Sequence, residues 1–188
     1  MRKFKRSRIL CMLNLMQKYL PFFLLMTLVF TSACASAELE KPQEGRDILA
    51  IAQSTGLELL PVSATEQSFL QLVLPAEERA ALRSAVLLRD GERVAALYFI
   101  QSPNAEKFSF AIKERAFDLF SSQMTNLIDE RVAREGYQAF DVFAFMDPVL
   151  GEDRFLFARI GESLYEFHVA AEKESVVQGL ILEVARVD

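Results

Sequence analysis

Apolar and polar residues follow two different periods in the second half of the chain. The segments SAVLLR and ERVAALYFIQ are rich in apolar residues. They are joined by Asp90-Gly91, a pair that tolerates the positive φ angles of a two-residue hairpin turn. We predict a β-hairpin here, with Arg89 opposite Glu92.

A second periodic segment runs from Ile112 to Arg134. Its apolar residues recur every four positions, as on one face of an amphipathic helix: Ile112, Ala116, Phe120, Met124, Ile128 and Val132. Glu130 precedes Arg134 at the i,i+4 spacing that stabilises helices, and Gly136 suits the position just after a helix. The pattern predicts one long helix over residues 112–134.

Three more strands and a closing helix follow. AFDVFAFM is apolar on both faces, which is typical of a strand inside a sheet. RFLFARI and LYEFHVA predict a hairpin around Gly161, in which Phe167 faces Leu156 across a two-residue turn or Phe157 across a three-residue turn. ESVVQGLILEVA predicts the last helix.

The segment before residue 84 predicts short helices. RDILAIAQST predicts a helix that ends at Gly56, and LELLPV predicts a short strand or an extended link. Ser63 and Glu66 match a capping box before a second helix, and Pro75 suits the first turn of a third. Residues 46–188 therefore predict a single α+β domain. We expect an antiparallel sheet of about five strands, with the long helix and the C-terminal helix packed mainly on one face.

Residues 1–37 have the composition of a secretory signal peptide. They carry six basic residues and no acid, and the apolar run YLPFFLLMTLVF is followed by small residues. A permanent membrane helix is disfavoured because the uninterrupted apolar stretch is shorter than the ~20 residues that span a bilayer. Translation could begin at Met12 or Met16, and the sequence leaves the start open.

The end of this signal contains two cleavage sites. Ala37 before Glu38 completes a small-x-small site for ordinary signal peptidase, which would release a soluble periplasmic or secreted domain. The overlapping stretch FTSAC resembles a bacterial lipobox, with Thr31 where that motif usually has Leu. Cleavage there would leave Cys34 as the first residue, and we favour Cys34 as a lipidation site. Ala35 after it resembles the outer-membrane rather than the inner-membrane sorting pattern.

Removing the signal changes the charge of the chain. Six of the 21 Lys and Arg residues and none of the 26 Asp and Glu residues lie in it, so the remainder has a formal charge of −11. An acidic chain without a basic run is a poor partner for nucleic acid. Residues 38–45, ELEKPQEG, are polar and contain Pro42 and Gly45, and they predict a short tether before the domain.

Few residues suited to catalysis follow the signal. The one histidine, His168, lies in a predicted strand without a G-x-S-x-G motif, and we interpret it as facing outward beside Glu166. Zinc sites need several His or Cys ligands, and no glycine-rich phosphate loop occurs, so no metal, cofactor or catalytic residue is predicted. Six phenylalanines are predicted to form core rather than a ligand pocket: Phe140, Phe143, Phe145, Phe155, Phe157 and Phe167.

The predicted order from Ile112 onward is long helix, strand, hairpin and closing helix. In DRFLFARIGESLYEFHVAAEKESVVQGLILEV, Gly161 and then Leu164 and Tyr165 precede the last helix. This part of the chain resembles the end of PsbP-like domains, which have a glycine turn, a Leu-Tyr entering the next strand and a final helix. The resemblance implies a non-catalytic binding or assembly module, as in the bacterial lipoproteins among these domains. The resemblance assigns no functional residue to this chain.

These observations predict an exported, lipid-anchored envelope protein that acts by binding or assembly. Its partner is an envelope protein or a small ligand, and it reaches the membrane through its N-terminal lipid. The alternative is a secreted hydrolase, because such an enzyme needs only two carboxylates placed by the fold. The 26 acids show no spacing that singles out a pair. A structural spacer of an envelope complex is the third possibility.

Overall fold

The computed structural model describes residues 46–64, 66–146 and 153–187. All of these residues belong to one unit of the chain, Pro42–Asp188. The predicted signal peptide with Cys34 and the predicted tether lie outside the described residues. None of the helices in the described part is both long enough and apolar enough to cross a membrane.

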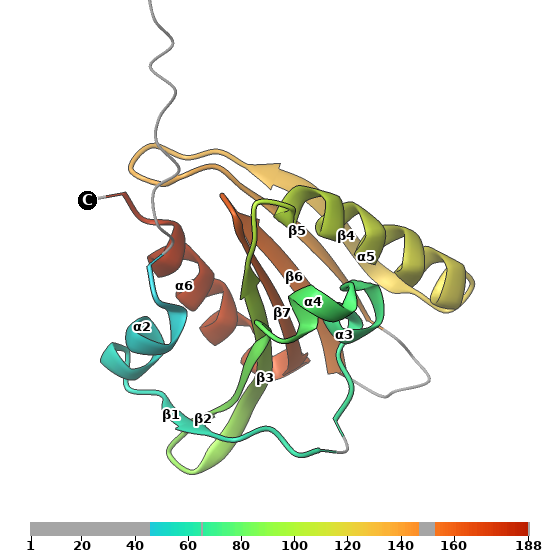
Figure 1. The fold of residues 1–188 in the computed structure, drawn as a ribbon. Coiled ribbons are helices and arrows are strands. Elements are labelled where there is room, and N and C mark those ends of the chain that lie inside the picture. The colour runs from blue at the N-terminus through green and yellow to red at the C-terminus, as the bar shows by residue number, and fades with distance from the viewer. Residues whose placement is uncertain (1–45, 65, 147–152, 188) are drawn as a thin grey trace, which may run out of the picture. The chain divides into compact units, whose positions relative to one another are not determined.

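An antiparallel sheet of seven strands forms the centre of this unit, in the spatial order β1-β2-β3-β7-β6-β5-β4 (Figure 1). The strands are β1 Glu58–Leu60, β2 Arg83–Arg89, β3 Glu92–Gln101, β4 Thr125–Val132, β5 Phe140–Met146, β6 Asp153–Ile160 and β7 Ser163–Ala170. The helices are α2 Ile48–Ser54, α3 Phe69–Val73, α4 Ala76–Arg79, α5 Ala105–Phe120 and α6 Glu174–Ala185, with a 3-10 turn η1 at Ala171–Lys173. Helix and antiparallel sheet combine as predicted, but with seven strands rather than about five.

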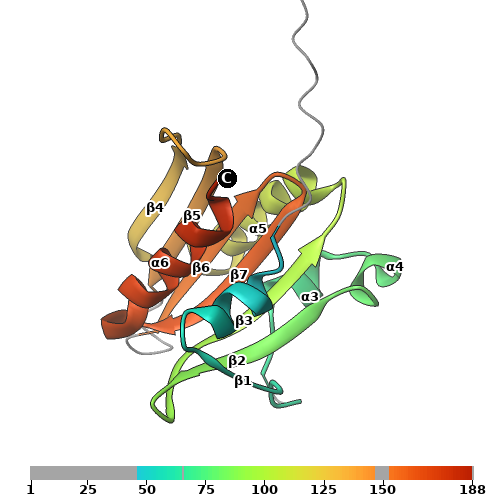
Figure 2. The ribbon, with the colours of Figure 1, turned by 90° about the vertical axis from the view of Figure 1, so that its left-hand side faces the viewer.

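Helices cover both faces of the sheet. On face A, α2 and α6 pack around residues such as Leu97 and Phe167, and on face B, α3 and α5 pack around residues such as Tyr98 and Phe145. Figures 1 and 2 show these helices on opposite sides of the strands. The prediction that the helices lie mainly on one face is therefore wrong. The central strands are apolar on both sides, and both sides must be covered from water.

The long helix predicted over residues 112–134 is two elements. α5 ends at Phe120, and after a short turn the chain continues as strand β4 from Thr125. A spacing of four residues keeps side chains on one face of a helix, but because four is even it does the same in a strand. Ile128 and Val132 accordingly face the same side of the sheet. β4 is one of the two additional strands, and the other is the short β1.

The hairpin formed by β2 and β3 is confirmed. Asp90 and Gly91 have φ angles of 55° and 79°, which fits a two-residue turn with positive φ at both positions. Arg89 pairs with Glu92, as predicted.

The hairpin formed by β6 and β7 is also confirmed, and its turn is the two-residue type. Ile160 pairs with Ser163, so Leu156 lies opposite Phe167 rather than Phe157. The register decides which side chains of β7 face each layer. Odd-numbered residues such as Phe167 enter face A, and even-numbered residues face B.

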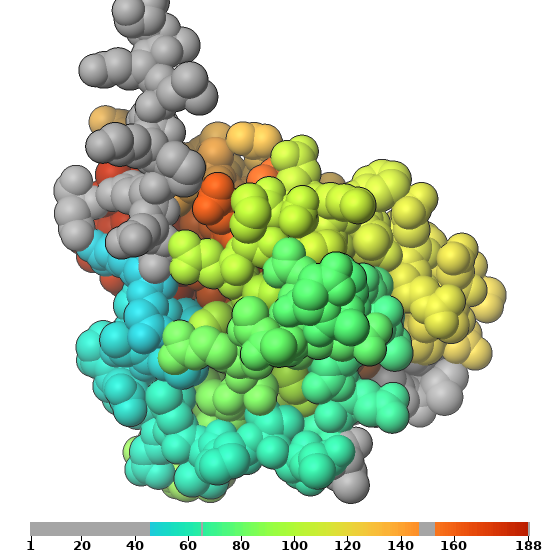
Figure 3. Space-filling view, in the orientation of Figure 1, coloured from blue at the N-terminus to red at the C-terminus, as the bar shows by residue number. Residues whose placement is uncertain are grey.

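The segment before β2 contains the three predicted helices, but the second and third are shorter than predicted, at Phe69–Val73 and Ala76–Arg79, and one has a different cap. α2 is followed by Gly56 at φ 83°, and Pro75 precedes α4. The capping box at Ser63 is wrong, because Ser68 caps α3 by accepting a hydrogen bond from the backbone N–H of Gln71 at 3.3 Å. In Figure 3 the α3–α4 segment lies against α5 on this side of the molecule.

Candidate functional site

Glu166 of β7 is a buried carboxylate with four hydrogen-bond donors. Its side chain is 0% exposed and meets the start of α3 on face B. Oε1 accepts from the backbone N–H of Phe69 at 2.8 Å, and Oε2 accepts from the N–H of Leu70 and the hydroxyl of Ser68, both at 2.8 Å. Nε2 of His168 lies 2.6 Å from Oε1, and in the tautomer that carries its proton on Nε2 it is the fourth donor. Such partners are needed to bury a charge, and here they fasten α3 to the sheet.

His168 does not face outward as the sequence predicts. Its side chain is 16% exposed and lies on face B near the rings of Tyr98 and Phe155, at centroid distances of 5.4 and 4.6 Å. α3 packs over this part of β7, which explains the difference. The hydroxyl of Ser68 donates to Glu166 rather than to His168. The three side chains therefore lack the order of a Ser–His–acid triad, in which histidine takes the serine proton.

Tyr98 lies opposite Glu166 on the neighbouring strand β3. It is 1% exposed, and among the described residues its hydroxyl has no hydrogen-bond partner. Burial first, and then the carboxylates of Glu66 and Glu166, raise the pKa of Tyr98 from 10.0 to about 12. The phenol is therefore neutral at neutral pH, and the hydrogen bonds around Glu166 join the start of α3 to β7.

A groove of about 240 Å³ lies on face A between α6 and strands β4, β5 and β6. Ile128, Val132 and Val142 contribute to its floor, and Ile181 and Leu182 of α6 form its wall. Figure 2 shows β4 beyond α6, at the edge of the sheet. The floor next to β4 is therefore only partly covered, and Ile128, Val132 and Val142 are half-buried.

Two acidic residues border this groove. Glu174, in the first turn of α6, accepts from Arg154 and from the side-chain amide of Gln178, both at 2.8 Å. Glu130 of β4 is exposed at the open side. The Glu174 charge is compensated by Arg154, whereas Glu130 offers an acceptor next to the apolar floor. The groove suits an apolar group that carries a donor or a positive charge beside it.

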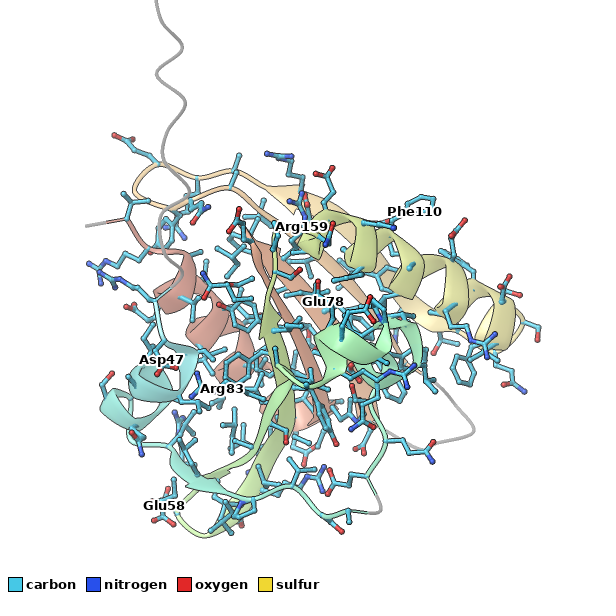
Figure 4. All side chains as sticks on the ribbon, in the orientation of Figure 1. Asp47, Glu58, Glu78, Arg83, Phe110 and Arg159 are labelled. Carbon is cyan, nitrogen blue, oxygen red and sulfur yellow. The ribbon has the colours of Figure 1, made fainter. Side chains whose placement is uncertain are left out.

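A second cavity, of about 300 Å³, lies near the start of α2 and is lined mainly by polar groups. The guanidinium of Arg83 lies 4.9 Å from the ring centroid of Phe99 and 3.8 Å from the Asp47 carboxylate. Figure 4 labels Asp47 and Arg83 side by side. Because these side chains already pair with one another, the groove on face A is the better candidate binding site.

The predicted core phenylalanines are all buried, at 8% exposure or less. Phe143, Phe145, Phe155 and Phe157 lie on face B, and Phe140 and Phe167 lie on face A. Of these six, Phe140 also lines the groove. No group of three or more His, Cys, Asp or Glu side chains in the described part of the chain is arranged to hold a metal ion.

The sequence did not reveal the groove. Ile128, Glu130 and Val132 belong to the segment that the sequence predicts as helix. Their position beside β5, on the same face of the sheet, was therefore not predicted. The four-residue spacing of Ile128 and Val132 was the available signal, and it fits a strand as well as a helix. Cys34, the predicted lipidation site, lies outside the described residues.

No family model and no curated protein matches the sequence. One solved structure, described as a GTP binding regulator from Thermotoga maritima, is similar over 74% of this chain and 84% of its own, with 11% identity and a TM-score of 0.45. A likeness this slight carries neither a fold family nor a function over to this chain.

Proposed function

We propose that this protein is an exported, lipid-anchored binding module of the bacterial cell envelope, and that the groove on face A receives its partner. The groove is the observation that carries the proposal. It keeps apolar side chains of β4, β5 and α6 half-open to water, and covering them on binding is favourable. The lipobox-like end of the signal around Cys34 supports export and anchoring. Of the order on which the resemblance to PsbP-like modules rests, β6, the glycine turn, β7 and α6 are present, whereas the long helix is divided into α5 and β4.

The size of the groove favours a protein partner over a small ligand. Pockets for drug-sized ligands and cofactors have volumes of ~300–1,000 Å³, and this groove has about 240 Å³. One or two apolar side chains of a protein segment fit such a space. Glu130 at the open side complements a Lys or Arg next to them. The proposed partner is an envelope protein that contributes a short apolar segment flanked by a basic residue.

Site-specific photo-crosslinking in living cells tests this proposal. A benzophenone amino acid at Gln178, which is exposed on the groove wall, is expected to crosslink one envelope protein through an apolar segment. The same probe at Leu72, 53% exposed on the α3 side of the sheet, is the matched position and should not capture that protein. Equal capture from both positions, or none from Gln178, would count against the groove.

A pair of leucine variants separates binding from stability. Leu182→Lys introduces a charge into the groove wall, and Leu72→Lys makes the same change at an exposed position on α3. Leu182→Lys is expected to abolish the Gln178 crosslink while the melting temperatures of both variants stay similar. A crosslink that survives Leu182→Lys would place the partner elsewhere.

The hydrolase alternative has one observation in its favour, since Glu130 and Glu174 line the same groove. A carboxylate pair across a groove is the minimum that glycoside hydrolysis needs. Screening the purified protein on glycans separates the two hypotheses. A binding module shows no turnover, whereas turnover that disappears in both Glu130→Gln and Glu174→Gln would establish the hydrolase.

A further inference from the structure

Strand β4 forms one edge of the sheet, and among the described residues no strand pairs with its outer side. The unpaired N–H and C=O groups of an edge strand are a template for another strand. The start of β4 is irregular, because its register with β5 shifts between Thr125 and Ile128 and Asn126 has a φ angle of 51°. From Ile128 to Val132 the pairing with β5 is continuous, so these five residues offer a regular edge.

Apolar side chains are exposed on both sides of this edge. The groove lies on face A. On face B, Leu127 of β4 is 47% exposed, and Phe110 and Phe117 of α5 are 62% and 41% exposed. Lys113, between them on the same flank of the helix, forms an ion pair with Asp129 of β4. That flank therefore adjoins β4, and Figure 4 labels Phe110 on the outer side of α5. Exposed apolar clusters of this kind mark interaction surfaces.

The regular part of β4 is complementary to itself. Two antiparallel copies centred on Glu130 place Asp129 opposite Arg131 twice and Ile128 opposite Val132 twice. A register centred on Asp129 or on Arg131 puts two like charges face to face and sets Glu130 against an apolar residue. In the first register the only like pair among the five residues is Glu130 with its own copy.

We propose that two copies of this chain associate through β4, antiparallel and centred on Glu130, so that the two sheets become continuous. Exposed apolar residues near the edge, Leu127 and Phe117 among them, are then covered on face B. On face A, the floor at Ile128 and Val132 continues into the second copy, whose α6 supplies the missing opposite wall. The dimer rests on the edge and its charges, and does not depend on what occupies the groove.

Disulfide trapping tests the register directly. In a mature chain that carries Cys34→Ser and has lost the signal with Cys11, the introduced cysteine is the only thiol. Glu130→Cys brings two thiols face to face, because directly opposed Cβ atoms lie ~4.5–5.5 Å apart. Arg131→Cys is the matched control, since its equivalent in the second copy is a diagonal neighbour at ~7–8 Å. We expect at least about tenfold more crosslinked dimer for Glu130→Cys, because only its thiols are within reach of a disulfide. Equal crosslinking of the two variants would overturn the register.

Sedimentation of charge variants tests the same contact without a covalent link. Asp129→Arg and Arg131→Asp alone are each expected to raise the dimer dissociation constant about tenfold. The double variant should restore most of the affinity, because opposite charges face one another again across the edge, although within each copy the exchanged charges face Lys113 and Asp141. Glu130→Gln should tighten the dimer about two- to fivefold by removing the like pair. A wild-type chain that stays monomeric up to about 1 mM overturns the proposal. So does a folded double variant that fails to restore association.

Discussion

Replacing Glu166 tests whether a buried carboxylate fastens α3 to the sheet. Glu166→Ala removes the acceptor of four hydrogen bonds, from Ser68, Phe69, Leu70 and His168. All four donors lie in a region that α3 shields from water, so solvent cannot replace the lost oxygen atoms without loosening the helix. We therefore expect a loss of stability and, before global unfolding, a local release of α3.

The magnitude follows from the number and kind of these bonds. Hydrogen bonds to a charged group contribute ~1.5–3 kcal/mol each, but they do not add, because removing the carboxylate also removes the cost of burying its charge. Each buried donor that is left without an acceptor costs ~1–3 kcal/mol, and because these costs do not add fully we take about 3–5 kcal/mol for the four together. We expect Glu166→Ala to lower the free energy of unfolding by this amount. Glu166→Gln keeps the shape of the side chain and one acceptor oxygen. It should lower the free energy of unfolding by about 1.5–3 kcal/mol, because the donors that met the other oxygen no longer have an acceptor.

Urea denaturation followed by circular dichroism measures both losses. Glu114→Ala, an exposed carboxylate on α5, is the matched control and should change stability by less than about 0.5 kcal/mol. Hydrogen exchange at the amides of Phe69 and Leu70 should accelerate in Glu166→Ala more than at the amides of β6. A Glu166→Ala protein within about 1 kcal/mol of wild type would refute the reasoning, because the size of a typical substitution effect is about that.

Three further predictions concern other parts of the chain. The pKa of the Tyr98 phenol is about 12 in the folded chain and ~10 in the unfolded chain. The contribution of Tyr98 to stability is therefore fully present below pH ~10 and is lost as the pH rises from ~10 to ~12, because the unfolded chain releases its proton first. Tyr98→Phe should reduce the fall in melting temperature over that range. Gly161→Ala and Gly91→Ala should each cost about 1–2 kcal/mol in chemical denaturation, because an L side chain is strained at the positive φ of both positions. A Cβ at Gly161 would also lie 2.8 Å from the Gln138 amide nitrogen, but that atom is the end of a flexible side chain and can move away. Mass spectrometry of the mature N-terminus should find a lipid-bearing fragment starting at Cys34 that is lost in Cys34→Ser; an unmodified chain starting at Glu38 would contradict the anchor.

Local signals predicted the hairpins and the closing helix well. Asp90, Gly91 and Gly161 adopt positive φ angles, which tight hairpin turns require. Each turn then sets the pairing of the two strands beside it. α6 begins and ends where the sequence predicts, at Glu174 and Ala185. In each case the decisive interactions lie within a few residues of one another.

The errors arose where the deciding contacts are distant in sequence. The stripe through Ile128 and Val132 fits a helix and a strand equally, and only pairing with β5 makes it a strand. The anchor at Glu166 was invisible for the same reason, since its partners Ser68, Phe69 and Leu70 precede it by 98, 97 and 96 residues. No local spacing indicates which acid among 26 is buried.

The two faces of the sheet separate stability from binding. Glu166 and its donors lie on face B under α3, whereas the groove lies on face A between α6 and β4. Replacing Glu166 should therefore lower stability while the folded molecules still bind the partner through the groove. Leu182→Lys should block the groove without releasing α3. β4 belongs to both proposals, because Ile128 and Val132 line the groove and also form the dimer edge. Charge variants at Asp129 and Arg131, which face the other side, can abolish the dimer while the groove lining of each copy stays intact. If the partner still crosslinks from Gln178 in such a monomer, it binds one copy alone. If the crosslink is lost, the partner also needs α6 of the second copy.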